Sequence, residues 1–190
     1  MLIDKPMQLI RCTQKLQKEM GLKKDDLVEA ESRFSFLGSW HANLLLIDRK
    51  KCLLFVNDKT LSNFIAPDVR RAEIKNLGVL FQRYLSCVLF AEGMSDGVIE
   101  KIMEEYREVG YAGTNSKSVL GSMKDLAFHY EYHILSEGGV HSPMVPEIIH
   151  KLNRMPMGAL GYKYPIEALK AMYEAPQLTA PMDKPELESE

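Results

Sequence analysis

The sequence predicts an α+β fold, with a mostly antiparallel sheet built around a central β-hairpin at about residues 40–57 and helices packed on it. The first observation is the stretch WHANLLLIDRKKCLLFVN, in which two runs of strand-forming residues flank the polar segment DRKK. The second is that strand-like segments dominate the first third of the chain, whereas helical periodicity dominates afterwards. A hairpin pairs its two strands antiparallel, which favours an antiparallel sheet.

The hairpin itself has two apolar faces. If residues 48–51 form the turn, Ile47 lies opposite Cys52, Asn43 opposite Val56, and His41 opposite Asp58. Alternate residues of a strand point to opposite faces, and here both faces are apolar in the middle. A strand that is apolar on both sides is usually covered on both sides, so we expect the hairpin to be central in the sheet.

The remaining elements follow in order. A strand at 7–12 and a short helix at 14–20, ended by Gly21, precede a long polar loop at 22–37. A further extended segment ends at Pro67, and a strand at 108–114 interrupts the helical part. Helices are predicted at 72–92, where the apolar stripe is widest, and at 95–106, 117–135, 146–153 and 166–174. Residues 154–164 are predicted to be irregular.

These elements suggest a single α+β domain over residues 1–174. The glycine-rich segment near residues 136–143 is the best internal boundary, so residues 145–174 are a candidate helical appendage to the main body. Residues 175–190 contain three prolines and end in acidic residues, which predicts a disordered tail.

Composition excludes several classes of protein. The 190 residues are 46% hydrophobic and 26% charged, which is ordinary for a globular domain with a full core. The net charge of −2 gives no general reason to expect nucleic acid as a partner. The first residues show no secretory signal and the longest apolar runs are too short to span a membrane, so we expect a soluble cytoplasmic protein. Its three cysteines, Cys12, Cys52 and Cys87, are then expected to be reduced and buried.

Four sequence blocks resemble an uncharacterised bacterial family that is known only as a domain of unknown function. The blocks are GSWHANLL at 38–45, NDKT at 57–60, TNSKSVLGSMKDL at 114–126 and NRMPMGALGYKYP at 153–165. The opening LIRCTQKL fits the same family, and the resemblance covers nearly all of the chain up to Tyr173. It implies a small, soluble, bacterial protein, and it implies no activity, cofactor or catalytic residue.

The first candidate site is catalytic and consists of His41 and Asp58, with Asn43 nearby as a candidate binding residue. A histidine that a carboxylate holds across a hairpin can act as an oriented general base. The carboxylate can equally fix the tautomer of a structural histidine beside Trp40, and Asp58 also suits the turn that follows the hairpin.

A second candidate site is a metal site on the helix at 117–135. Asp125, His129 and His133 follow one another at intervals of four residues, so they share one helix face. Two imidazoles and a carboxylate at this spacing can bind a transition metal. The sequence lacks the glutamate of the HExxH zinc signature, and the alternative is a polar stripe beside the core. No cofactor is expected, apart from a divalent metal if this site is used.

Two further groups are candidates for binding. Asn115 and Ser118 lie at the start of the same helix, where free N–H groups attract anions, although capping alone explains such residues. Arg70 and Arg71, together with the basic turn at 49–51, are able to contact nucleic acid phosphates, or simply keep this surface solvated.

These observations lead to two functional hypotheses. The first is a non-enzymatic cytosolic protein that binds a protein or other macromolecular partner, with the irregular segment 155–164 as a contact surface. The alternative is a small hydrolase or metal-dependent enzyme that gathers the histidines and aspartates named above around one pocket.

Overall fold

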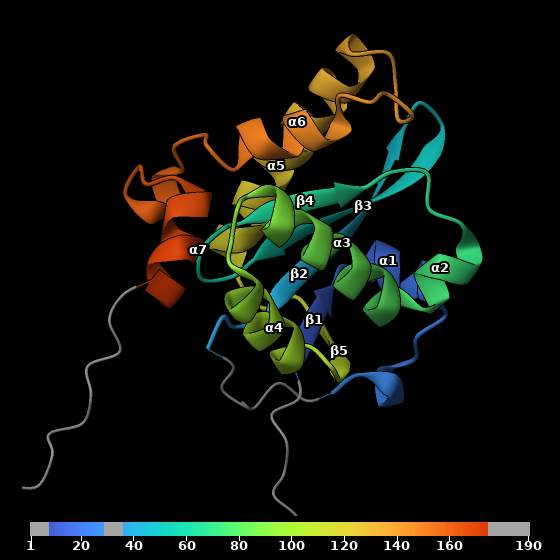
Figure 1. The fold of residues 1–190 in the computed structure, drawn as a ribbon. Coiled ribbons are helices and arrows are strands. Elements are labelled where there is room, and N and C mark those ends of the chain that lie inside the picture. The colour runs from blue at the N-terminus through green and yellow to red at the C-terminus, as the bar shows by residue number, and fades with distance from the viewer. Residues whose placement is uncertain (1–7, 29–35, 175–190) are drawn as a thin grey trace, which may run out of the picture.

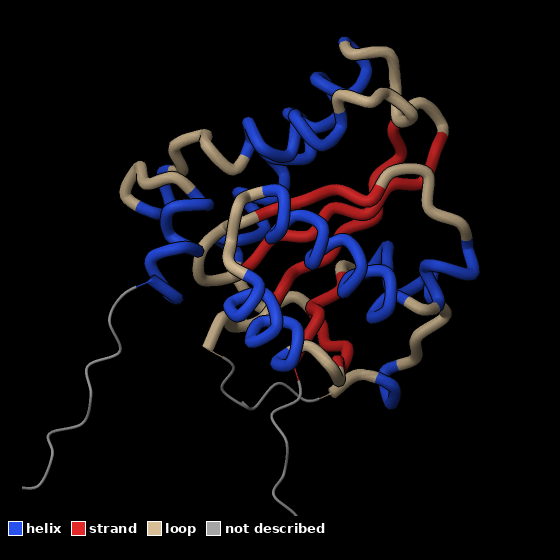
Figure 2. Tube along the Cα trace, viewed as in Figure 1, coloured by secondary structure: helices blue, strands red, loops and turns tan. Residues whose placement is uncertain are grey.

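The computed structural model describes residues 8–28 and 36–174, and in it a central sheet is covered by helices on both faces (Figure 1). Coloured by secondary structure, the strands form one twisted layer between the helices (Figure 2). The strand order is β4-β3-β2-β1-β5. The residue ranges are β1 (Gln8–Cys12), β2 (Trp40–Ile47), β3 (Lys50–Asn57), β4 (Asn63–Ala66) and β5 (Val109–Gly113).

The α+β class is confirmed, but the expectation of a mostly antiparallel sheet is wrong because the sheet is mixed. The hairpin β2–β3 and its neighbour β4 are antiparallel. On the other side, β1 runs parallel to both β2 and β5. Both parallel pairings join strands that are separated by long connections, and such crossovers, unlike hairpins, bring strands into parallel alignment.

The helices lie close to the predicted ranges. Their bounds are α1 (Gln14–Met20), α2 (Arg71–Lys75), α3 (Leu77–Ala91), α4 (Asp96–Glu105), α5 (Lys117–Ser136), α6 (Val145–Leu152) and α7 (Pro165–Glu174), with short 3-10 turns at Lys24–Asp26 and Gly158–Leu160. The single helix predicted at 72–92 is instead two helices that meet at Asn76. Part of the predicted loop at 22–37, residues 29–35, and the predicted tail lie outside the described residues.

The break at Asn76 lets α3 approach the sheet closely. Asn76 leaves the helical conformation, with φ −104° and ψ 44°, and its carbonyl accepts from the amide of Leu80. Two residues later, a Cβ atom added to Gly78 would lie 2.5 Å from Cγ2 of Val109. Only glycine therefore fits where α3 crosses β5.

The hairpin turn is tighter than predicted, and this changes the pairing. Asp48 and Arg49 both have positive φ, 48° and 59°, as in a two-residue turn whose twist matches that of the strands. Ile47 therefore pairs with Lys50 instead of Cys52. The shift is by two residues, so each side chain keeps its predicted face. The expected juxtaposition of His41 and Asp58 is wrong, because His41 pairs with Val56.

The hairpin is buried on both faces, as predicted. On one face, Phe81 of α3 packs against Trp40 and Phe55, with ring centroids 5.4 Å apart in each pair, and against Phe64 at 5.9 Å. The opposite face is covered by α5, whose buried residues are Val119, Met123, Leu126, Tyr130 and Ile134. Among the described helices, none is both long and apolar enough to cross a membrane.

The segment after α6 is joined to the sheet by buried hydrogen bonds. The side-chain amide of Asn153 donates to the carbonyl of Asn63 at 2.7 Å, and its oxygen accepts from the amide of Asn63 at 3.0 Å. The hydroxyl of Ser62 donates to the carbonyl of Pro165 at 3.1 Å. Residues 145–174, the candidate appendage, are thus connected to the edge strand β4.

Candidate functional site

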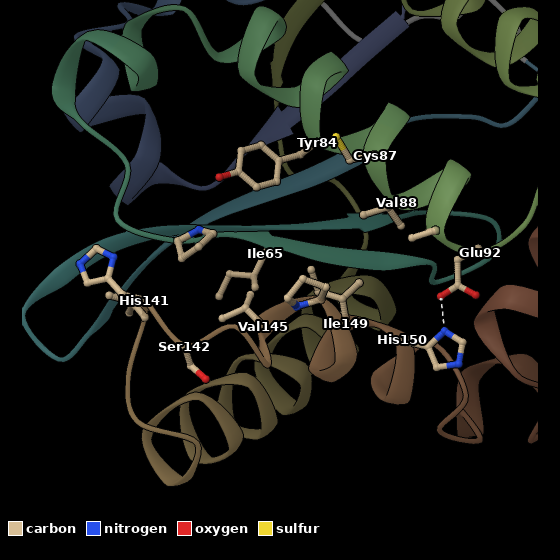
Figure 3. Close-up of a pocket in the computed structure, with 14 residues that line it drawn as sticks. Ile65, Tyr84, Cys87, Val88, Glu92, His141, Ser142, Val145, Ile149 and His150 are labelled. Atoms are coloured by element: carbon tan, nitrogen blue, oxygen red, sulfur yellow. Dashed lines mark ion pairs between the residues drawn. The ribbon is translucent and has the colours of Figure 1, made fainter.

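A groove follows the outer edge of β4, between α3 and the segment that leads into α6 (Figure 3). It encloses about 290 Å³ and is lined by residues of three segments. The lining residues are Ile65 of β4 and Pro67 just after it, Tyr84, Cys87, Val88 and Ala91 of α3 with Glu92 at its end, and, on the opposite side, Val140, His141, Ser142, Val145, Pro146, Ile149 and His150. The three elements are far apart in the sequence, so the groove exists only in the folded chain.

The edge strand β4 contributes Ile65 to the groove. In an antiparallel pair, successive residues turn their N–H and C=O groups alternately toward and away from the partner strand. Asn63 turns these groups away from β3, because both are bonded to the side chain of Asn153. Ile65, two residues further along β4, has the same orientation and lies in the groove.

The walls of the groove are mainly apolar. Val88 of α3 faces Val145 and Ile149 of α6 across it (Figure 3), and Ala91 also lines the groove. Cys87 also lines the groove, and its thiol is exposed, whereas Cys12 and Cys52 are buried. The prediction that all three cysteines are buried is therefore wrong for Cys87, which lies on the outer side of α3.

One end of the groove carries a buried carboxylate. The side chain of Glu92, which is only 2% exposed, lies 3.3 Å from Nδ1 of His150 and 2.8 Å from Nη1 of Arg154. Both neighbours belong to the α6 side, so this cluster joins the two walls. Glu92 and His150 lie together at this end in Figure 3, and His141 lies at the other end.

Within this cluster, Arg154 donates its hydrogen bonds to His150 and not to the carboxylate of Glu92. Nη1 of Arg154 is directed to Nδ1 of His150 at 2.9 Å and to the His150 carbonyl at 3.2 Å. A ring nitrogen that accepts from Arg154 has no proton to donate to Glu92. Oε2 of Glu92 is buried and accepts no hydrogen bond, although the arginine charge is close.

At the opposite end, His141 lies 3.3 Å from the carboxylate of Asp68, which is also 3.5 Å from Nζ of Lys50. His141 is 71% exposed, so this end is open to solvent. The groove is therefore polar at both ends and apolar between them.

The predicted catalytic pair lies elsewhere, in a second polar cluster beneath α5. Arg11 of β1 pairs with His41 of β2, and the charge of Arg11 acts on Asp58. His41 is fully buried, and neither of its ring nitrogens has a hydrogen-bond partner. Nε of Arg11 and Oδ1 of Asp58 are also buried without partners, although Nη1 of Arg11 donates to the carbonyl of Gly113 at 3.2 Å.

Burial dominates the pKa values in this cluster. Burial and, as the smaller cause, the charge of Arg11 lower the pKa of His41 to about 4, so the imidazole is neutral at physiological pH. Burial raises the pKa of Asp58, against the opposing effects of the Ser39 backbone, Lys59 and Arg11. A neutral histidine can accept a proton, but no substrate reaches a fully buried ring.

The three residues of the predicted metal site share one face of α5, but the structure gathers no further ligand around them. The rings of His129 and His133 are stacked with centroids 6.5 Å apart. Within residues 8–28 and 36–174, no group of three or more His, Cys, Asp and Glu side chains is arranged to hold a metal ion. Asp125 and His129 instead line a shallow groove of about 600 Å³ against residues 155–159.

Among the described residues, the histidines and aspartates that were predicted to form one enzyme pocket do not line a common pocket. The groove that contains Asp125 and His129 contains neither His41 nor Asp58. The reason is helical geometry, since Leu126 and Tyr130 turn inward to the sheet while Asp125 points outward.

The predicted binding residues are dispersed. Asn43 accepts a hydrogen bond from Thr13 at 3.0 Å. Asn115 and Ser118 are exposed, and the side chain of Ser116 caps α5 by accepting from the amide of Val119.

The basic residues are also exposed. Arg70 and Arg71 lie at the start of α2, where the amide of Arg70 donates to Glu73 at 3.0 Å. At the start of β3, Lys50 and Lys51 form ion pairs with Asp68 and Glu19, respectively. These pairs reduce the positive charge available at the hairpin tip.

Sequence reasoning missed Glu92, His150 and Arg154. A signal for Glu92 was present, because it continues the apolar stripe of α3 at four residues after Val88 and seven after Leu85. A carboxylate on a buried stripe is unusual and needs a partner. His150 and Arg154 are also four residues apart, but nothing in the sequence placed them next to Glu92.

Comparison with known proteins identifies a family. The profile of DUF6933, a domain of unknown function, matches residues 9–168. A search of curated proteins found no match. The matched region begins at the second residue of β1 and ends in α7, so it includes residues of all five strands and both walls of the groove. The chain therefore belongs to the DUF6933 family.

Proposed function

We propose that the protein binds an extended segment of a partner polypeptide, which adds to the outer edge of β4 in the groove between α3 and α6. The observation that carries this proposal is the pairing of Asn63 with Asn153. One side chain there supplies both the acceptor and the donor that a residue of a further strand would supply. Ile65 presents the same pair of main-chain groups one step along the strand.

The walls of the groove suit an added peptide. Main-chain hydrogen bonds to an exposed strand edge give affinity, and pockets for alternate side chains give specificity. Val88, Ala91, Val145 and Ile149 offer such contacts on either side of Ile65. This proposal agrees with the hypothesis of a partner-binding protein, but it assigns the contact to the groove instead of the segment 155–164.

The experiment is a selection of peptides from a random display library, repeated on two variants. Ala91→Trp fills the groove from an exposed helical position, so the fold is preserved. Ala171→Trp makes the same substitution at an exposed position of α7, away from the groove. We expect peptides that bind the wild type and Ala171→Trp but bind Ala91→Trp at least tenfold more weakly, since a lost groove contact is worth roughly 1.4 kcal/mol or more.

Alkylation of Cys87 provides a direct readout. It is the exposed cysteine, and the other two are buried, so bound peptide should slow its reaction with iodoacetamide. Peptides that bind Ala91→Trp as tightly as the wild type, or that leave Cys87 unprotected, would contradict the proposal.

A second candidate function is hydrolysis that uses His41 and Asp58, because these residues and Arg11 carry buried polar atoms without hydrogen-bond partners. Such groups are unusual in native interiors and call for an explanation. This candidate requires the cluster to open. Hydrolysis of a panel of ester and phosphoester substrates, lost in His41→Gln while the fold is retained, would support it, and an inactive wild type would exclude it for those substrates.

A further inference from the structure

We infer that the groove receives the amino-terminal end of the partner chain, with the ammonium group of that chain at the carboxylate of Glu92. This inference rests on the proposed function. It specifies which part of a polypeptide binds and in which direction it lies.

The first argument is that the groove is blocked at one end. Asn153 occupies the outward N–H and C=O groups of Asn63, and its side chain is buried. A peptide that pairs with Ile65 cannot extend along the strand edge beyond this position. A chain terminus fits such an end better than the middle of a long segment does.

The second argument is the chemistry at the blocked end. Glu92 and His150 line the groove there, and Oε2 of Glu92 is buried without a hydrogen-bond donor, although its ion-pair partner Arg154 lies 2.8 Å away. Arg154 lies beside Oε2 and gives its hydrogen bonds to His150. Oε1 lies 3.3 Å from Nδ1 of His150, and it is the oxygen that we assign to the ammonium group. Buried carboxylates are normally hydrogen-bonded, and an ammonium group offers three donors.

The third argument is the orientation of the two helices. The carboxyl end of α3 lies at Glu92, and its last turn contains no basic residue. The amino end of α6 begins at Val145, toward the opposite end of the groove. Helix dipoles favour positive charge at the first of these ends and carbonyl oxygens or negative charge at the second. A peptide lying parallel to β4, with its amino terminus at Glu92, satisfies both.

The residues after the terminus are expected to be apolar. The ligand passes between Val88 and Ala91 on one side and Val145 and Ile149 on the other. The volume of about 290 Å³ limits the enclosed part to the first few residues. The chemical class of the ligand is therefore a free amino terminus followed by small or medium apolar side chains.

The experiment compares two pools of short peptides built from alanine, valine, leucine and isoleucine, with amidated carboxyl termini. One pool has free amino termini and the other is acetylated. Protection of Cys87 from iodoacetamide is measured as a function of peptide concentration on the wild-type protein. We expect half-protection at a concentration at least tenfold lower for the free amines, because acetylation removes the charge-assisted hydrogen bonds that an ammonium group donates to a carboxylate.

Two variants test whether Glu92 is the group that produces the preference for free amino termini. Glu92→Gln should abolish the difference between the pools, and Glu147→Gln, which alters an exposed carboxylate of α6 outside the groove, should preserve it. Thermal unfolding establishes that each variant is folded. The wild-type comparison alone decides the question if Glu92→Gln does not fold.

The outcomes separate the two proposals. Equal protection by both pools would overturn the inference about the amino terminus and leave peptide binding in the groove intact. Protection by neither pool would overturn both for apolar peptides. A preference for free amines that survives in Glu92→Gln would show that Glu92 is not the group that recognises them.

Discussion

Two buried polar clusters lie on the same line of paired residues across the sheet, and they differ in whether their polar atoms have hydrogen-bond partners. The line crosses the five strands through Ala112, Arg11, His41, Val56 and Asn63. At the Asn63 end the polar side chain has partners, since its oxygen accepts from Tyr130 at 2.7 Å and its nitrogen donates to the carbonyl of Leu61 at 3.0 Å. In the cluster around His41, neither ring nitrogen of His41 has a hydrogen-bond partner.

Buried polar groups with partners and buried polar groups without partners have different effects on stability. A network in which each group is paired stabilises a unique structure, and here it attaches the segment after α6 to the edge strand. A cluster with unpaired groups stabilises little and makes folding depend on pH. Three experiments test this contrast, in order of decreasing expected effect.

The largest effect is expected for Asn153→Ala. The substitution leaves the N–H and C=O of Asn63 buried without partners, and each such group costs about 1–3 kcal/mol. We expect the free energy of unfolding in urea to fall by about 4 kcal/mol. Asn115→Ala, at an exposed position, is the matched control and should change it by less than about 0.5 kcal/mol. A small loss in Asn153→Ala would mean that the edge network is not needed for stability.

The second effect is acid destabilisation through His41. Its pKa is about 4 in the folded protein and about 6.5 when unfolded, so the unfolded state binds the proton more tightly. The contribution of neutral His41 to the free energy of unfolding is therefore complete above pH 6.5 and is lost as the pH falls toward 4. The loss reaches up to about 3 kcal/mol, at 1.36 kcal/mol for each unit of pKa difference.

Asp58 acts in the opposite direction in this range. Its pKa is raised in the folded state, so it favours folding below its unfolded value and loses that contribution as the pH rises. We expect a net acid loss in the wild type, measured by urea unfolding between pH 4 and 7, and a flatter curve in His41→Gln. Parallel curves for the two proteins would show that His41 does not bind its proton differently on unfolding.

The smallest effect is expected for Tyr130→Phe. The change removes one hydroxyl that donates to Asn63 in the buried network and leaves the ring in place. The loss should be about 1–2 kcal/mol in the same unfolding assay, because one buried acceptor loses its donor. Tyr132→Phe, on the exposed side of the same helix, should have almost no effect. A loss similar to that of Asn153→Ala would indicate that Tyr130 organises the whole network.

Much of the fold was predictable, because the relevant patterns are local. The strand at 7–12, the helices near 95–106, 117–135 and 146–153, and the burial of the hairpin on both faces all follow from periodicity and caps. The break at Asn76 and the tight turn at Asp48 and Arg49 were missed. Both depend on whether one residue adopts a less common backbone conformation, which tertiary contacts decide.

The candidate site was less predictable. His41 and Asp58 were recognised as unusual, but the two-residue change in register removed their direct pairing. The groove was not predicted at all, since Glu92, Ile65 and His150 come from three distant segments. Each of these residues has an ordinary role in its own helix or strand.

The sequence by itself determined the elements, their apolar faces and the central place of the hairpin, because these depend on the spacing of side chains within a few turns of chain. Only the tertiary structure decided that β1 and β5 pair in parallel, that β4 forms the edge beside the groove, and that Glu92 lies beside His150 and Arg154. The physical reason is that strand order and helix contacts arise from packing between distant segments. Many arrangements satisfy the same local pattern, and the combined packing of the whole core selects one of them.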